Sequence, residues 1–529
     1  MAVVTVCRVP TPQDLLAELA RGYRAPRLRH VAHRHERAAA WAEWPPWISP
    51  VVVGAFTGAG AGRLWSHQRT ALDLIGQRRH TVLATGTASG KSLAYLAPAL
   101  SWAQEGSFDP GGRGATVLYL SPTKALAADQ LTRIEALAVP GVRAATYDGD
   151  TPPDERRWVR DHANIVLSNP DLLHHSLLPG HERWSRFLRS LKLVVIDECH
   201  TYRGVFGTHV SAVLRRLTRI CARYGAQPTF VLASATVAAP AEHASALIRM
   251  PCTAGVDDGS PRAGLTLAFW EPPTMEGARR SATTEAAELL SELVARQVQT
   301  VAFARSRAGV EALATSARRR LEELDPTAVE RVAAYRGGYL PAERRTLEAD
   351  LRSGRILGLA ATNALELGVD VSGLDAVIVA GWPGRRASLW QQVGRAGRTG
   401  TDALAVFVAA DDPLDTYLLG HPQAVLDAPV EATVMDPANP VVIGPHLAAA
   451  AAELPLTPED LELFGPHARR LVDALVAKGI LRRRPRGWFW AREDRPAAHI
   501  SLRGTESVVS VVEAGSGRVL GTVDAASAH

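Results

Sequence analysis

The feature that most constrains the fold of this chain is a short apolar run followed by a loop of small residues and a helix-like stretch. His80–Ala84 has the length and composition of a buried strand, and Ser92–Leu100 has those of a helix start. The loop between them, Thr85–Ser92, reads TGTASGKS. A strand, a small-residue loop and a helix in this order are typical of a parallel α/β sheet whose loop surrounds a phosphate group. The sequence therefore predicts an α/β fold with a phosphate site at the end of this strand.

The loop carries the chemistry that a nucleoside triphosphate needs. Lys91 would reach the β- and γ-phosphates of ATP, and Ser92 would hold Mg²⁺. Thr85 stands where the strict pattern has glycine, which leaves the first turn of the loop open. The alternative is a turn that binds nothing. In the phosphate-binding interpretation, backbone N–H groups would surround the phosphates, and they come from Gly86, Thr87, Ala88, Ser89 and Gly90.

An acidic motif ends a second continuous apolar run. Leu191–Ile196 is typical of a strand buried on both faces of a parallel sheet. The motif DECH follows at its carboxyl end, which is where ligands bind in open α/β folds. Asp197 would complete the Mg²⁺ shell, Glu198 would polarise the attacking water, and His200 would couple the site to a second lobe. The alternative is a salt-bridged strand end.

A motif at the end of a third apolar strand argues against that alternative. Another apolar strand ends in Ser234–Thr236, and Gln391–Arg398 reads QQVGRAGR. Arg395 and Arg398 are three residues apart, which predicts that they share one face of a helix. Arginines inserted from a second lobe would stabilise the charge on a phosphoryl group in transfer, although a solvated basic helix face is the alternative. The order of the motifs predicts a motor that hydrolyses ATP between two lobes and moves on nucleic acid.

Longer stretches give a specific resemblance. The chain resembles superfamily 2 helicases, and within them the bacterial mitomycin-repair helicases, which are related to the RecQ-four-like repair helicases of fungi and plants and to the mycobacterial SftH helicases. The resemblance covers roughly residues 40 to 529. It rests on YDGDT (147–151), SNPDLL (168–173), TYRGVFGTHVSAVLRRL (201–217), FARSR (303–307), YRGGYLPAERR (335–345), ATNALELGVD (361–370), WQQVGRAGR (390–398) and MDPANPVVIGPHLAAAAAELPL (435–456).

This resemblance implies an ATP-dependent 3′-to-5′ DNA helicase or translocase with a role in DNA repair. The resemblance also places Gln68 at the position where relatives read adenine, and its amide can donate and accept as an adenine edge requires. It places Asp370 near the ribose. Trp65 would either stack on the base or belong to the core. The family's carboxy-terminal zinc domain with four cysteines is missing, so the chain looks truncated relative to its family. The four cysteines present are not at metal-ligand spacing, so no zinc site is expected; they are Cys7, Cys199, Cys221 and Cys252.

Composition shifts and motif positions predict the domain organisation. The expected fold is two tandem RecA-like parallel-sheet domains, then a winged helix and a truncated β segment, because strand–helix alternation occurs in both halves. A Trp/Pro cluster at 41–47 is expected to pack on the first lobe. The expected domains are an irregular arm (1–62), an ATP-binding lobe (63–258), a second helicase lobe (259–425), a winged helix (426–500) and the start of a β domain with one hairpin (501–529).

Net charge and hydropathy agree with a nucleic-acid motor. The net charge is +5 and the sequence pI is about 9.1, which suits binding to a polyanion. No apolar run approaches the ~18 residues of a membrane span, and the first residues lack the pattern of a signal peptide. We therefore expect a cytoplasmic protein with no membrane partner. The expected partner is single-stranded DNA or a 3′-tailed duplex, and the oligomeric state stays open.

The nucleic-acid contacts are expected from four short motifs of hydroxyls, amides and cations. Such groups hold phosphates and read no base sequence, as a motor needs. The residues alone leave DNA and RNA open, so an RNA helicase or remodelling translocase remains an alternative, and a catalytically dead scaffold is a further one. The motifs comprise Pro122, Thr123 and Lys124; Ser168 and Asn169; Arg305, Ser306 and Arg307; and Thr362 and Asn363.

A basic, aromatic segment ends the expected winged helix. Trp488 and Trp490 would either stack on unpaired bases or belong to the core, with only the arginines in solvent. The four arginines are expected to grip phosphates, and they are Arg482, Arg483, Arg484 and Arg486. Only about twenty residues separate Val371 from Gln391. That leaves no room for a long strand-separating hairpin, so strand separation would need another wedge.

Overall fold

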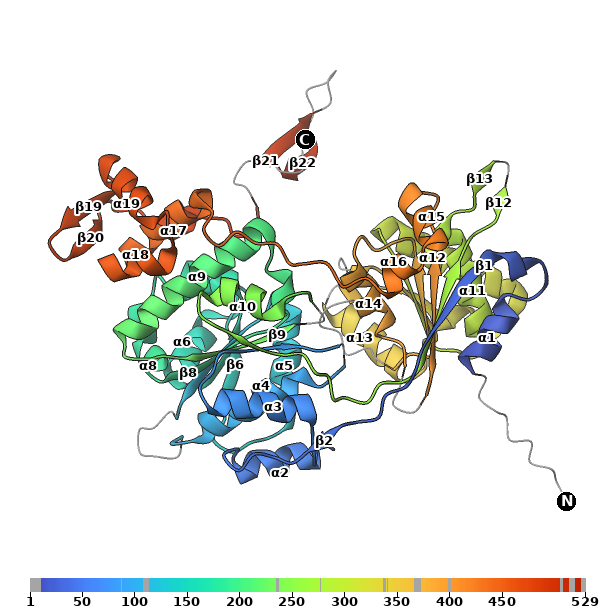
Figure 1. The fold of residues 1–529 in the computed structure, drawn as a ribbon, viewed down its shortest axis with the longest axis horizontal. Coiled ribbons are helices and arrows are strands. Elements are labelled where there is room, and N and C mark those ends of the chain that lie inside the picture. Colours follow the sequence, from blue (N-terminus) through green and yellow to red (C-terminus); the bar gives the residue numbers. More distant parts are fainter. Residues whose placement is uncertain are drawn as a thin grey trace.

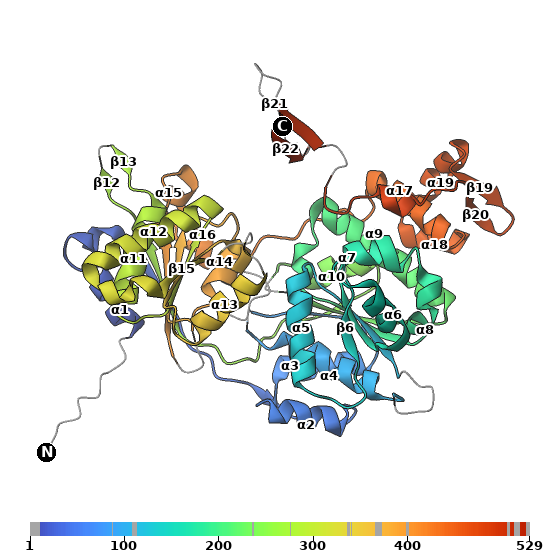
Figure 2. The same cartoon turned by 180° about the vertical axis from the view of Figure 1, so that it is seen from behind.

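The computed structural model describes residues 11–86, 88–107, 114–234, 237–275, 277–335, 339, 341–365, 373–397 and 401–504, together with strands at 508–512 and 519–524. Within these residues the chain forms two α/β lobes and a small domain that sits on the first of them (Figure 1). The fold predicted from the sequence, two parallel sheets followed by a winged helix, is confirmed. From behind, the same arrangement shows helices on both faces of each sheet (Figure 2).

Lobe one contains the phosphate loop. Its sheet has seven described strands in the order β10-β4-β9-β8-β5-β7-β6, and all neighbours are parallel. Continuous apolar runs form the central strands because helices cover both faces. The strands are β4 (Thr81–Ala84), β5 (Thr116–Leu120), β6 (Ala144–Thr146), β7 (Ile165–Ser168), β8 (Leu191–Ile196), β9 (Thr229–Ser234) and β10 (Thr253–Gly255). The main helices are α3 (Ser66–Gly76), α4 (Lys91–Gln104), α5 (Lys124–Ala136), α6 (Pro153–His162), α8 (Ser185–Arg189), α9 (Gly204–Arg223) and α10 (Pro240–Ile248).

Lobe two has a second sheet of seven described strands, in the order β1-β11-β18-β17-β14-β16-β15. Its strands are parallel except β1, which pairs antiparallel with β11. The strands are β1 (Leu28–Arg34), β11 (Leu265–Trp270), β14 (Thr300–Ala304), β15 (Val332–Tyr335), β16 (Gly358–Ala361), β17 (Ala376–Ala380) and β18 (Ala403–Val408). The helices are α11 (Ala282–Ala295), α12 (Arg307–Leu324), α13 (Pro341–Arg352), α14 (Arg386–Val393), α15 (Pro413–Gly420) and α16 (Gln423–Leu426).

We expected an irregular N-terminal arm, but this segment forms regular elements and is built into both lobes. Helix α1 (Pro12–Leu19) buries its leucines in the core of lobe two, and β1 covers the edge of β11. The chain then crosses to lobe one, where α2 (Pro50–Gly58) packs. Trp47 stacks on Trp102 with ring centroids 5.7 Å apart, which confirms the expected packing patch. The arm is ordered because an exposed strand edge gains hydrogen bonds from any strand that pairs with it.

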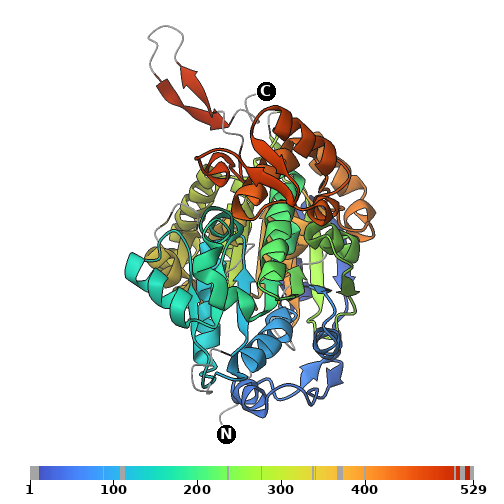
Figure 3. The ribbon, with the colours of Figure 1, turned by 90° about the vertical axis from the view of Figure 1, so that its left-hand side faces the viewer.

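The third domain follows lobe two in the sequence but packs on lobe one. In the fully described stretch 426–504, three helices precede a two-stranded wing: α17 (Pro440–Glu453), α18 (Pro458–Phe464), α19 (Ala468–Ala477), β19 (Leu481–Arg484) and β20 (Gly487–Trp490). Figure 3 shows this winged helix above α9. Trp488 is buried in its core and Trp490 is half-buried, whereas the four wing arginines are exposed. Strands β21 (Val508–Val512) and β22 (Val519–Asp524) form the expected hairpin.

Helix α9 joins lobe one to the winged helix through buried arginines. Arg216 pairs with Glu453, and both side chains are almost fully buried. Arg219 Nε lies 2.7 Å from Asp460 Oδ1. Arg215 donates to backbone carbonyl oxygens on the winged-helix side, one of them at 2.9 Å. A buried charge is stable only when it is paired and hydrogen-bonded, so this interface holds the two domains in one relative position.

A cluster of histidines surrounds Arg216 at the same interface. Arg216 donates to Nδ1 of His174 at 2.6 Å and to Nδ1 of His446 at 3.2 Å. Both rings must therefore be neutral, and His446 Nε2 can donate to His209 Nδ1 at 3.0 Å. Burial, and then the Arg216 charge, lower the pKa of His174 to about 2 and hold the pKa of His446 well below its usual range. Among the described side chains, no group of three or more is arranged to hold a metal ion.

Candidate active site

The phosphate loop has the compact backbone that its glycines allow. Gly90 adopts φ +63, and a Cβ atom there would lie 2.6 Å from atoms of both Trp65 and Gln68. Only glycine fits this conformation and this approach. Helix α4 then begins at Lys91, whose Nζ donates to the carbonyl oxygens of Thr85 at 3.0 Å and Gly86 at 2.7 Å. The lysine therefore lies over the loop, at the place where it would meet phosphates; Thr87 lies outside the described residues.

Thr85, at the position where the strict pattern has glycine, strengthens the loop instead of distorting it. Its hydroxyl lies 2.6 Å from Ser89 Oγ, and Ser89 Oγ donates to Gly86 O at 2.8 Å. Thr85 is buried, so its hydroxyl needs such a partner. The threonine thus fixes the first turn through a side-chain bond across the loop.

Asp197 lies at the carboxyl end of β8 between two buried tyrosines. Its Oδ2 accepts from Tyr95 at 2.9 Å and from Tyr119 at 2.5 Å. The Tyr95 hydroxyl also lies 3.2 Å from Ser92 Oγ, so one tyrosine brings the two expected Mg²⁺ ligands together. Burial raises the pKa of Asp197. Sequence reasoning missed both tyrosines; the spacing of Tyr95 one helical turn after Ser92 was a weak signal.

Glu198 and His200 point from lobe one toward lobe two. Glu198 adopts φ +47, a strained conformation for a non-glycine residue that is frequent at functional sites. Its Oε2 lies 3.3 Å from His200 Nδ1, and His200 Nε2 lies 3.0 Å from the side-chain nitrogen of Gln391 in α14. The amide nitrogen can only donate, so His200 Nε2 accepts and the ring is neutral. Burial and the nearby charges of Lys91 and Arg385 lower the pKa of His200 to about 4.

Arg395 follows α14 but does not belong to it, so the prediction that Arg395 and Arg398 share a helix face is wrong. Helix α14 ends at Val393, with Gly394 as its cap. Gly397 then adopts φ +97, and its N–H donates to Leu374 O at 2.8 Å, which turns the chain away from the helix. The Arg395 charge opposes the raised pKa of Glu198 and contributes to lowering that of Lys91, so Arg395 lies near both groups; that it reaches the phosphates stays a prediction. Arg398 and Asp370 lie outside the described residues.

A cleft of about 540 Å³ separates the lobes beside the phosphate loop. Lobe one contributes Trp65 and the loop, and lobe two contributes Trp390 and Gly397. Gln68 uses both ends of its amide to hold the loop: Oε1 accepts from Trp65 N and Nε2 donates to Gly90 O, each at 2.9 Å. The role of Gln68 in reading adenine stays a prediction, because it would require these bonds to exchange. The cleft also contains arginines that sequence reasoning missed, namely Arg34, Arg37 and Arg262.

The expected nucleic-acid contacts of lobe one lie at the carboxyl ends of the neighbouring strands β5 and β7. Thr123 caps α5, and Lys124 Nζ lies 2.7 Å from Asp150 Oδ2 in the loop after β6. Ser168 Oγ donates to Tyr147 O at 2.6 Å. Asn169 caps α7 (Pro170–Leu172) by accepting from Leu172 N at 2.9 Å. The structure therefore brings these motifs to one edge of the sheet.

Arg503, which sequence reasoning missed, joins two of these motifs. Its Nη2 donates to the carbonyl oxygen of Pro122, and its Nε donates to Asp171 Oδ2, both at 2.9 Å. The guanidinium also lies over the ring of Phe206, 4.7 Å from the centroid. Arg503 comes from the segment that leaves the winged helix, so its contacts are distant in sequence and no local motif indicates them.

The expected contacts of lobe two gather at the carboxyl ends of β14 and β16. Ser306 caps α12 by accepting from Gly309 N at 3.0 Å, with the exposed Arg305 and Arg307 on either side. Thr362 and Asn363 follow β16, the neighbouring strand. A cavity of about 490 Å³ lies here, and Arg305 and Asn363 both line it.

Comparison with known protein families agrees with this geometry. The DEAD/DEAH box helicase family matches residues 65–244, and the helicase conserved C-terminal domain matches residues 285–400. The winged helix domain of the ATP-dependent helicase HRQ1 matches residues 435–505. These matches coincide with lobe one, most of lobe two and the winged helix. Within the part of the chain that the structure describes, no helix is long and apolar enough to span a membrane.

Similar proteins and structures extend over nearly the whole chain. The ATP-dependent helicase YprA of Bacillus subtilis is 40% identical over 94% of this chain and 67% of its own length. HRQ1 of Saccharomyces cerevisiae is 38% identical over 77% of this chain but only 39% of its own length. The crystal structure of the DUF1998 helicase MrfA bound to DNA has a TM-score of 0.88 at 37% identity, covering 97% of this chain and 68% of that chain. The chain therefore belongs to the DEAD/DEAH-box ATP-dependent helicases, in the family that contains YprA.

Proposed function

We propose that this chain moves 3′-to-5′ along single-stranded DNA, as part of DNA repair, with ATP hydrolysed between its lobes. The observation that carries the proposal is the contact of His200 with Gln391. It joins the motif that holds Glu198 to the helix that precedes Arg395. Closure of the lobes on ATP would therefore bring lobe two to the reacting phosphates. It would also move the expected nucleic-acid contacts of lobe two (305–307 and 362–363) relative to those of lobe one (122–124 and 168–169), and these four motifs are called the gripping motifs below.

The described residues fit ATP with Mg²⁺. Glu198 Oε2 is buried beside His200 Nδ1, 3.3 Å away, where the carboxylate would orient a water when substrate arrives. Ser92 and Asp197, held together through Tyr95, would hold Mg²⁺, which neutralises charge on the β- and γ-phosphates when bound. Lys91 would exchange its two loop carbonyls for phosphate oxygens, and Arg395 would stabilise the charge of the transition state.

DNA is the preferred polymer in this proposal because of the relatives. MrfA was crystallised with DNA, and the Mycobacterium smegmatis helicase Lhr, with a TM-score of 0.68 at 25% identity, was solved with single-stranded DNA. This chain spans 39% of HRQ1 and 61% of Lhr, so their whole activity carries over only as a proposal. The expected phosphate contacts read neither base nor sugar, which keeps RNA as the second candidate.

The test compares phosphate release in the presence of single-stranded DNA and of RNA of the same sequence. We expect DNA to stimulate hydrolysis strongly and RNA weakly. Duplexes with a 3′ or a 5′ single-stranded tail then report direction, and the 3′-tailed duplex should give the higher translocation signal. Stronger stimulation by RNA, or a preference for the 5′ tail, would contradict the proposal.

The Glu198→Gln variant is the chemical control for this test. It should bind ATP as the unmutated chain does but lose turnover, because only the activation of water is removed. Lys91→Ala should in addition weaken ATP binding. Hydrolysis by Glu198→Gln at the normal rate would show that DECH is not the hydrolysis motif.

A further inference from the structure

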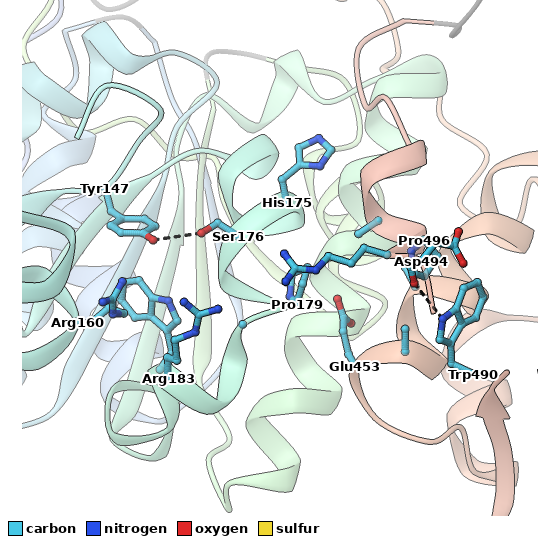
Figure 4. Close-up of a pocket in the computed structure, with 16 residues that line it drawn as sticks. Tyr147, Arg160, His175, Ser176, Pro179, Arg183, Glu453, Trp490, Asp494 and Pro496 are labelled. Atoms are coloured by element: carbon cyan, nitrogen blue, oxygen red, sulfur yellow. Dashed lines mark hydrogen bonds between the residues drawn. The ribbon is translucent and has the colours of Figure 1, made fainter. Parts of the chain in front are cut away.

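A second cavity, of about 330 Å³, lies where lobe one meets the winged helix, away from the nucleotide cleft. Lobe one contributes residues of α6, η2 (Leu173–Leu177) and η3 (His181–Trp184). The winged-helix side contributes α17, β20 and the residues around η7 (Pro496–His499). Figure 4 shows Arg160 and Arg183 on one side of this space and Trp490 and Asp494 on the other.

The lining of this cavity is cationic. Arg160, Arg183 and Arg495 come from three different elements. Of its two acids, Glu453 pairs with Arg216, whereas Asp494 Oδ2 lies 3.2 Å from His499 Nε2, so one carboxylate faces three arginines. Among the described residues, the guanidinium groups of Arg183 and Arg495 have no hydrogen-bond or ion-pair partner. The cavity therefore offers cations that its own walls do not neutralise.

The walls of the cavity are held in place before any ligand arrives. His181 bridges them, with Nδ1 2.8 Å from the Tyr224 hydroxyl and Nε2 3.0 Å from Glu453 O. Trp490 is fixed because its indole N–H donates to Asp494 O at 3.1 Å. A preformed site loses little conformational entropy on binding. The ring of Trp490 also adds an apolar wall beside the arginines. Grooves that bind single-stranded nucleic acids combine basic and aromatic side chains in the same way.

The cavity continues the nucleic-acid edge of lobe one. Ser176, which lines it, follows Asn169 by seven residues along the continuous segment of α7 and the π-helical η2, or at most about 10 Å at the α-helical rise of 1.5 Å per residue. Tyr147, on the same wall, directly precedes the loop whose Asp150 pairs with Lys124. A strand held by the gripping motifs thus has the cavity within reach.

We propose that this cavity binds the phosphodiester backbone of the nucleic-acid strand where the strand passes from the gripping motifs of lobe one to the winged helix. The inference rests on the proposed function. Arg183 and Arg495 are exposed, so they would hold a free phosphate weakly. A strand already bound at the gripping motifs reaches them at a high effective concentration, and that favours a strand over a free nucleotide.

The test measures the affinity for single-stranded DNA against salt concentration, with a short oligonucleotide that covers only the two lobes and a longer one. For the Arg183→Ala/Arg495→Ala variant, the slope of log affinity against log salt for the longer strand should be shallower by about 1.4, since each lost phosphate contact on a single strand contributes about 0.7. Each single variant should lose about half of that. Binding of the short strand should not change.

The control is the Arg186→Ala/Arg189→Ala variant, which removes the same charge from exposed positions on the neighbouring helix α8. It should keep the slope of the unmutated chain for both strands. An unchanged slope for Arg183→Ala/Arg495→Ala on the longer strand would overturn the inference and leave the proposed function standing. If the unmutated chain binds neither strand, the proposed function fails as well.

A second arm distinguishes a strand from a free phosphate. Inorganic phosphate and AMP are titrated into the Lys91→Ala variant, in which the nucleotide loop is disabled. We expect no saturable binding that depends on Arg183 and Arg495. Saturable AMP binding that disappears in the additional Arg183→Ala/Arg495→Ala background would overturn the assignment to a strand.

Discussion

Lobe one makes two interfaces of opposite character. Toward the winged helix it presents buried arginines paired with acids, and Ala449 and Ile500 enter its hydrophobic core. Toward lobe two it faces a cleft of about 540 Å³, across which His200 meets Gln391. The first interface is held closed by buried ion pairs beside one cavity, and the second is an open, polar cleft.

The difference indicates which part of the molecule moves. Removing one partner of a buried ion pair is costly, so the winged helix should travel with lobe one as a single body. An open cleft has two accessible states, and a ligand that binds the closed state better shifts the population toward it. We therefore expect lobe two to be the moving part, with the winged helix as an extension of the surface of lobe one.

The largest expected effect comes from Arg395, on the open side. Arg395→Ala should lower DNA-stimulated hydrolysis by about 10³-fold or more, because an arginine that stabilises the transferring phosphoryl group is worth that much. ATP affinity should change little. Steady-state phosphate release and ATP titration check this, with Arg319→Ala on the exposed face of α12 as the control. A rate close to that of the control would remove Arg395 from the reaction.

Breaking the closed interface should cost stability instead of rate. Glu453→Ala leaves Arg216 buried without its carboxylate, so the free energy of unfolding should fall by about 3–5 kcal/mol. The Arg216→Met/Glu453→Leu pair should recover much of this loss. Gln391→Ala at the open interface should cost only about 1 kcal/mol. Urea unfolding measures all three, and equal losses at the two interfaces would contradict the comparison.

Acid should open the closed interface. The pKa of His174 is about 2, and that of His446 is also far below its unfolded value of 6.5. Their stabilising contribution is therefore complete above pH 6.5 and is lost as pH falls, by about 1.4 kcal/mol per pH unit for each ring that stays neutral. Urea unfolding from about pH 7.5 to about pH 5 tests this. His446→Gln should flatten the dependence, whereas His162→Gln, exposed on α6, should leave it unchanged.

The smallest expected effect belongs to Arg503, which follows the winged helix in sequence and contacts the expected nucleic-acid motifs of lobe one. Arg503→Ala frees the Pro122 and Asp171 loops from each other, and DNA affinity should fall a few-fold, about 0.5–1 kcal/mol for a half-exposed pair. Arg503→Lys should recover part of the affinity, since it keeps the charge but not the fork. Anisotropy titrations measure both, and unaltered affinity in Arg503→Ala would limit Arg503 to a packing role.

Much of the fold was predictable because buried parallel strands have a distinctive sequence. The strand predicted at Leu191–Ile196 agrees with β8 to the residue, and the strand predicted at His80–Ala84 begins one residue before β4. The place of the loop between β4 and α4 was predictable too, because an apolar strand precedes it and a helix-like stretch follows it.

The rest depends on contacts that are distant in the chain. The residues of β1 alternate irregularly in burial, and their partner strand lies beyond lobe one. Arg503 meets residues 332 and 381 positions away. Arg395 was placed on a helix because spacing alone cannot show that Gly397 turns the chain through a positive φ. The domain limits and the individual roles of the site residues stay predictions for the experiments above.

The pairing of β1 with β11 has a consequence for how this protein is made. Strand β1 ends at Arg34 and β11 begins at Leu265, so 265 − 34 = 231 positions separate them. At about 5–20 residues per second, a ribosome takes roughly 10–50 s to synthesise that interval. Lobe one can fold during this time, while β1 waits for its partner. An amino-terminal fusion that traps this segment should therefore impair lobe two while leaving lobe one intact.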